Sequence, residues 1–149
     1  MAEIGFYHLT RSTLEQALPR LLGRVLALPG RAVILCGSRE RLEALDAFLW
    51  TCPEPDWLPH GHVQNADAPH HPIWLATEDA APPNGARHLF LTDGAVSARL
   101  SEYDRVFDLF DGRDEAAVQA ARGRWKAAKA AGHGLAYWQQ TASGWDRKG

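Results

Sequence analysis

The chain has 149 residues, a length that usually forms one domain. Hydrophobic residues make up 46% of it and charged residues 23%, as in an ordinary globular protein, which argues against a disordered chain. The net charge of −2 argues against a protein whose whole surface grips nucleic acid, although a local basic patch is compatible with it.

The two cysteines, Cys36 and Cys52, have no CxxC spacing, which favours a reducing compartment over a disulfide framework. The first residues, "MAEIGFYHLT", include an early acid and do not read as a signal peptide. No apolar stretch approaches the ~18 residues that a membrane span needs. We therefore expect a soluble, cytoplasmic protein.

The first half of the chain alternates apolar runs with helical patterns. The expected elements are a strand at 4–9, a helix from Ser12 to about Leu28, a strand at 31–36, a helix at 39–50 and a loop at 51–72. Ser12 and Glu15 have the spacing of a capping box, and "PG" at 29–30 ends the first helix. The run "RAVILC" is apolar at consecutive positions, which is typical of a strand covered on both faces.

The second half continues the same alternation. Its expected elements are strands at 73–77, 88–93 and 105–110, a short helix at 97–103 and a long helix at 114–132. The long helix is acidic at its start, basic near its end and closed by Gly132, which suits the helix dipole and a glycine C-cap. The tail at 138–149 is expected to hold at most one short strand and then to fray.

This alternation predicts the α/β class. We expect residues 1–149 to form a single three-layer domain, with a mostly parallel sheet and helices on both faces. The sequence contains no internal repeat and no linker that would divide it.

Two local patterns invite a chemical interpretation, and each has a simpler one. His60, His62, His70 and His71 cluster in a proline-rich segment, but zinc sites need a defined ligand spacing that these residues lack, so we expect no metal. The turn Cys36-Gly37-Ser38 follows a strand and precedes a helix, where a nucleotide loop or an activated thiol would lie.

The turn carries neither glycine-rich phosphate motif, and a buried cysteine followed by a serine N-cap explains it equally well. A small nucleotide-binding enzyme that uses this turn is therefore kept as the alternative hypothesis. We expect no catalytic residue and no cofactor otherwise.

The helix at 114–132 carries the sharpest pattern in the sequence. Arg122, Lys126 and Lys129 share one face, and Trp125 borders it. Arginine pairs well with carboxylates and an indole supplies apolar contact, so this face suits an anionic ligand with an apolar group. The alternative is a solvated basic face whose tryptophan lies in the core.

Several segments, taken together and in order, resemble one known family. They are "FYHL", "LPRLL", "RAVILC", "LDAFLWT", "WLPHG", "FDLFDGRDEAA" and "ARGRWKAAKAAGHGLAYWQQ". This series is similar to the chi subunit of bacterial DNA polymerase III, and it extends over nearly the whole chain.

The resemblance implies a non-catalytic accessory subunit of the clamp-loader complex, located with the replisome at the bacterial nucleoid. Its implied partners are the psi subunit and the acidic C-terminal tail of single-stranded DNA-binding protein, without strong direct binding to DNA. The residues implied to bind the tail are Trp57, Phe110, Arg122, Trp125, Lys126 and Lys129. Relatives can carry a further basic residue where this chain has Val118, and Arg113 is a candidate to replace its charge.

Overall fold

The computed structural model describes most of the sheet and the two helices that cover it. The described residues are 3–11, 17–18, 21, 31–50, 60–62, 73–77, 79, 86–92, 94–97, 99–141 and 144–148. Within them the elements are β1 (Glu3–Leu9), β2 (Ala32–Leu35), α2 (Arg39–Trp50), β3 (His60–His62), β4 (Ile73–Ala76), β5 (His88–Leu91), the 3-10 helix η2 (Leu100–Glu102), β6 (Arg105–Asp111), α3 (Glu115–Ala130), β7 (Gly134–Thr141) and β8 (Gly144–Arg147).

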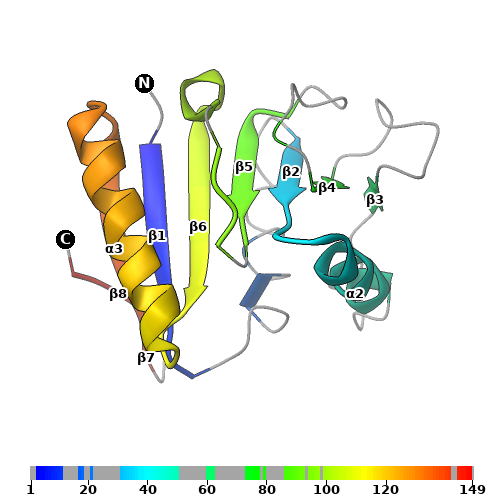
Figure 1. Ribbon diagram of the computed structural model, residues 1–149, viewed down its shortest axis with the longest axis horizontal. Helices are drawn as coiled ribbons and strands as arrows, with labels where there is room; N and C mark the ends of the chain where they lie inside the picture. The colour runs from blue at the N-terminus through cyan, green and yellow to red at the C-terminus, as the bar shows by residue number, and fades with distance from the viewer. Residues whose placement is uncertain are drawn as a thin grey trace.

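The strands form one eight-stranded sheet in the order β3-β4-β2-β5-β6-β1-β7-β8. Every neighbouring pair is parallel except β7 and β8, which are antiparallel. In Figure 1 β2, β4, β3 and α2 lie on the right side of the sheet, and α3 lies along its left side with β1 and β7. The α/β class and the mostly parallel sheet predicted from the sequence are confirmed.

Helices cover both faces of the sheet, as predicted. Leu42 and Leu45 of α2 pack with Ile34 and Phe90 on one face, in a cluster that also holds Leu18. Ala121 and Ala128 of α3 pack on the other face, in a cluster that includes Val33, Leu35 and Leu91. Because successive residues of a strand point to opposite faces, the apolar runs of the central strands supply both clusters.

Three segments differ from the sequence prediction. The loop expected at 51–72 contains the edge strand His60–His62, which pairs with β4. The helix expected at 97–103 is only the short 3-10 helix η2. The tail expected to fray, 138–149, contributes half of β7 and all of β8, joined from Trp138↔Arg147 to Thr141↔Gly144.

Helix α3 has the end signals that the sequence predicted. The Asp114 side chain caps it by accepting a hydrogen bond from the Ala116 amide at 3.0 Å. At the other end Gly132 has φ of 85°, and the amides of Gly132 and His133 donate to the carbonyls of Lys129 and Ala128. This pattern is a Schellman motif, in which the left-handed residue is almost always glycine.

A buried ion pair joins α3 to the middle of the sheet. The Arg124 Nε and Nη2 atoms donate to the two carboxylate oxygens of Asp108 at 2.6 and 2.9 Å. The side chains are only 14% and 2% exposed. Burial raises the pKa of the Asp108 carboxyl, and the Arg124 guanidinium opposes that rise.

We predict that breaking this pair destabilises the protein strongly, because the remaining charge would be buried without a partner. Asp108→Ala or Arg124→Ala should each lower the free energy of unfolding by ~3–5 kcal/mol. The double variant Asp108→Leu/Arg124→Met should lose clearly less than the sum. Urea unfolding of the four proteins measures this, and additive losses would contradict the coupling.

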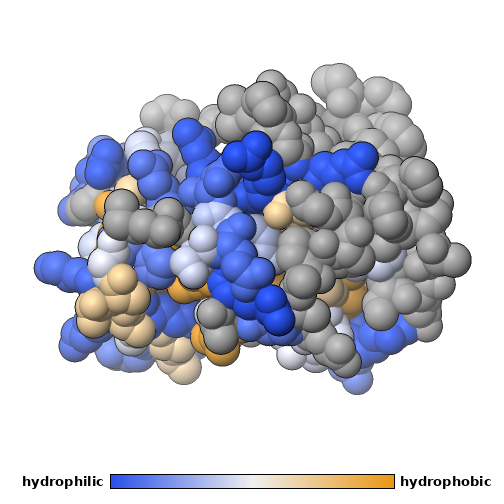
Figure 2. Space-filling model, turned by 90° about the horizontal axis from the view of Figure 1, so that it is seen from above, coloured by the Kyte–Doolittle hydropathy of each residue, from blue (hydrophilic) through white to orange (hydrophobic). Residues whose placement is uncertain are grey.

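None of the helices in the described part of the chain is long and apolar enough to span a membrane. In Figure 2, blue hydrophilic residues predominate among those drawn in colour, and orange ones form only small patches between them.

Candidate functional site

Three cations of α3 form the basic face predicted from the sequence. Arg122, Lys126 and Lys129 are all exposed. Among the described residues, none of the three takes part in an ion pair, whereas five of the other described arginines each have a carboxylate partner. We call these three residues the α3 basic face. Its charge is not neutralised within the described structure and is available to an anionic partner.

Trp125 is half-buried at the border of this face, between α3 and the strands beneath it. Its ring lies edge-on to Phe6 at 5.2 Å and to Tyr137 at 5.9 Å, measured between ring centroids. Such edge-to-face contacts stabilise an aromatic pair beyond simple burial. Trp125 therefore belongs partly to the core, as the simpler interpretation of the sequence expected, and partly to the surface.

An aromatic cluster lies beneath the basic face, toward the carboxyl ends of β1 and β6. We define it as His8, Phe110, Trp125 and Tyr137. His8 Nδ1 and the Tyr137 hydroxyl oxygen are 2.6 Å apart and share a hydrogen bond. Phe110 is 5% exposed and lies 5.1 Å from the His8 ring and 6.1 Å from the Tyr137 ring. Phe110 is therefore the buried member of the cluster: it packs against the other rings and exposes little surface to a ligand.

Arg122 couples the basic face to this cluster. Partial burial raises the pKa of the Tyr137 hydroxyl, and the positive charge of Arg122 opposes the rise. The hydroxyl is consequently neutral near pH 7. The cluster and Arg122 together thus offer aromatic edges, the neutral Tyr137 hydroxyl and a guanidinium within one small region.

The loop between β6 and α3 is shaped to fit the His8 ring. The Gly112 amide donates to the Leu9 carbonyl at 2.7 Å, and a Cβ atom at Gly112 would collide with the His8 ring. Arg113 pairs with Asp111 at 3.3 Å, so its charge is already matched. In the segment "FDLFDGRDEAA", Gly112 therefore lets the loop pack onto His8, and Asp114 starts α3 as its N-cap.

We predict opposite effects for two glycine substitutions in this region. Gly112→Ala should destabilise the protein by ~1–3 kcal/mol, because the His8 ring and the Leu9 carbonyl leave no room. Gly123→Ala, with nothing within 4 Å of the added atom, should stabilise α3 by ~0.5–1 kcal/mol.

Thermal unfolding of both glycine variants beside the parent provides the measurement. A stabilised or unchanged Gly112→Ala variant would show that the loop does not press on His8.

The remaining sequence predictions for the site have mixed outcomes. Trp57 lies outside the described residues, so its part in the site stays a prediction. Val118 of α3, the position considered for a further cation, is half-buried and packs against the core beneath the helix. The charge of the face therefore comes from Arg122 onward.

Sequence reasoning missed His8, Tyr137 and Arg124. Arg124 occupies a position between Ala121 and Ala128 on the inward face of α3, and a charge within a stripe of alanines is the signal of a buried ion pair. Tyr137 and Leu135 occupy alternate positions of β7, in the stretch between the expected helix and the expected tail for which the sequence predicts no element. No local pattern distinguishes His8, which acts only through its neighbours in space.

The residues of the alternative site around Cys36 have structural roles, in the core and at the start of α2. The Cys36 thiol is buried at 2% exposure, and the Ser38 hydroxyl accepts from the Arg41 amide at 3.2 Å, as an N-cap does. The hollow beside this turn is lined by Asp79, and its described lining residues include no lysine or arginine that would bind phosphate. These observations lend the nucleotide hypothesis no support.

No group of three or more potential metal ligands occurs among the residues whose placement is described. His70, His71 and Cys52 lie outside them, and only the backbone of His60 and His62 is described.

Comparison with known proteins shows the class of protein to which the chain belongs. The chain matches the family model "DNA polymerase III chi subunit, HolC" over residues 1–136. This places it among the accessory subunits of a replicative DNA polymerase. The chain belongs to the DNA polymerase III chi subunit family, as its motifs indicated.

A relative described as "Probable DNA polymerase III subunit chi" from Rickettsia prowazekii (strain Madrid E) is 28% identical over 110 residues. The match covers 72% of this chain and 66% of the relative, which is just under two thirds of the relative's length.

Proposed function

We propose that this replication accessory protein acts by binding and not by chemistry. It would join the clamp loader, through a psi subunit, to single-stranded DNA-binding protein, whose acidic C-terminal tail would dock on the α3 basic face. The observation that carries this proposal is the stripe of three exposed cations, with no ion pair to any described residue, beside a half-buried aromatic cluster.

The α3 basic face and the aromatic cluster would bind different parts of the tail. Lys126 and Lys129 would attract the acidic residues of the tail, mainly raising the association rate, at ~0.2–1 kcal/mol for each exposed pair. Arg122 would pair with a carboxylate, because its planar guanidinium matches that group in a bidentate manner. The terminal apolar side chain would contact Trp125 and Tyr137.

We predict that Arg122→Ala weakens binding of a labelled acidic tail peptide by about tenfold or more, since a charge-assisted hydrogen bond contributes ~1.5–3 kcal/mol. Fluorescence anisotropy at two salt concentrations measures the loss. Arg39→Ala removes the same charge from an exposed position on α2 and is the matched control. Equal affinity of Arg122→Ala and the parent would overturn the site.

A second peptide tests the apolar contact separately. Replacing the terminal apolar residue of the tail by serine should weaken binding to the parent well beyond the loss from one rim charge, because a buried anchor typically contributes ~2 kcal/mol or more. Trp125→Ala should produce a similar loss, with thermal unfolding of the variant as the control for its contact with Phe6.

The link to a psi subunit needs its own test, because it involves a different surface. Co-expression of the tagged chain with a psi subunit should yield a complex that also retains a resin-bound tail peptide. Arg122→Ala should abolish retention on the peptide resin and leave the complex with psi intact. Loss of both interactions would argue against two separate surfaces.

A further inference from the structure

A row of aromatic side chains crosses the face of the sheet that lies opposite α3. Phe90 and Phe107 face each other across β5 and β6 with ring centroids 4.5 Å apart and planes 8° from parallel. Tyr7 follows on β1, 5.8 Å from Phe107, and Trp138 stands directly across from Tyr7 on β7, at 6.5 Å and 12°. The row ends on β8, where the Arg147 guanidinium lies 6.0 Å from the Trp138 ring centroid.

The row runs from the core to the surface. Phe90 is fully buried and Phe107 is 9% exposed, whereas Tyr7 and Trp138 are only half-buried. The buried end therefore holds the ring planes of the exposed end in place. Tyr7 is held further by Trp145, whose ring meets it edge-on at 5.1 Å.

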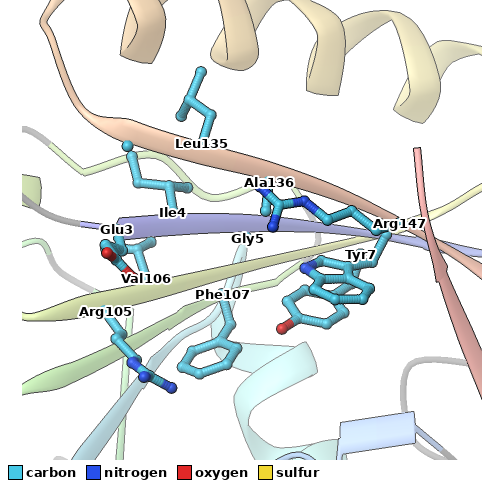
Figure 3. Close-up of a pocket in the computed structure, with 12 residues that line it drawn as sticks. Glu3, Ile4, Gly5, Tyr7, Arg105, Val106, Phe107, Leu135, Ala136 and Arg147 are labelled. Atoms are coloured by element: carbon cyan, nitrogen blue, oxygen red, sulfur yellow. The ribbon is translucent and has the colours of Figure 1, made fainter. Parts of the chain in front are cut away.

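A hollow of about 420 Å³ opens beside the exposed end of the row. Its floor consists of small residues on neighbouring strands, with Gly5 beside Ala136 and Gly134 beside Glu3. Figure 3 shows Leu135 and Ile4 pointing toward α3, while Tyr7 and Phe107 point to the opposite side. The hollow exists because Ile4 and Leu135, larger side chains of these strands, point toward α3 and leave the small floor residues on the opposite face.

The charges around the hollow favour an anion. Arg105 and Arg147 line it, and among its described lining residues the only carboxylate is that of Glu3. Figure 3 shows Arg147 reaching from β8 toward Ala136. Among the described residues Arg105 forms no ion pair.

We propose that this hollow binds a nucleotide of single-stranded DNA, with the base against Tyr7 and Trp138 and phosphates near Arg105 and Arg147. Proteins that bind single-stranded DNA combine fixed aromatic rings with arginines, because every base has a flat π face that can stack and every phosphodiester carries a negative charge. Its size and its two cations fit one or two nucleotides, so the contact is weak and depends on salt.

This inference goes beyond docking of the tail, which uses the other face of the sheet. It also relies on Trp138 and Arg147, which lie past the span of the family match, residues 1–136.

The test is a titration of a labelled oligothymidylate with the full chain at low salt, followed by anisotropy. Trp138→Ala should weaken binding at least fivefold, the lower limit for the loss of one stacked base. Ala136→Leu, which fills the hollow and keeps the aromatic row, should weaken it similarly. Glu3→Gln should strengthen it, because it removes the only negative charge among the described lining residues.

A fourth variant and three controls complete the test. Arg105→Gln should weaken binding and reduce its salt dependence, whereas Arg39→Gln removes the same charge from α2 and should change neither. Phe48→Ala removes an exposed aromatic ring from α2, which packs against β3 and β4 at the other end of the sheet, and should have no effect. Arg122→Ala should leave oligonucleotide binding unchanged, which separates this site from tail docking.

Several results would overturn the proposal. They are unchanged binding in Trp138→Ala and Ala136→Leu, equal competition by a free deoxynucleoside triphosphate, competition by the acidic tail peptide, and a self-association of the chain that Ala136→Leu abolishes. The second result would assign the hollow to a free nucleotide, the third to a peptide and the last to a second copy of the chain.

Discussion

The ion pair between Arg124 and Asp108 fixes how α3 lies on the sheet. It is nearly excluded from water and has two hydrogen bonds, so rotation of the helix would leave two charges unpaired in the core. Because helix residues are 100° apart, holding Arg124 inward also decides where its neighbours point. Arg122, Lys126 and Lys129 then face outward, and Trp125 lies over β1 and β7.

The half of the sheet formed by β6, β1 and β7 has two contrasting faces. Alternate side chains of these strands, among them His8, Phe110 and Tyr137, point toward α3 and belong to the aromatic cluster. Side chains at the other parity form the aromatic row and the hollow. A one-residue shift of β7 relative to β1 would exchange the two sets, so strand register determines both surfaces.

Glycines contribute to both faces for a steric reason. At Gly112 a side chain would strike the His8 ring, and at Gly5 a Cβ would lie 2.8 Å from a ring atom of Tyr7. The two rings can occupy their places only because these positions carry no side chain. Small residues thus allow close packing under the loop at Gly112, and others, at Gly134 and Ala136, leave open space beside β1.

The sequence by itself determined the class of fold, most strand and helix positions, both ends of α3 and the shared face of its three cations. These features depend on spacing within one segment, which periodicity and capping residues record directly. The family followed from the same segments, read in order. The partnership of Arg124 with Asp108 was decided only by the tertiary structure, as were the contacts of His8 with Tyr137 and the strands formed by the tail. Each of them joins residues that are far apart in the chain or depends on which strand lies beside which, and local spacing carries no record of that.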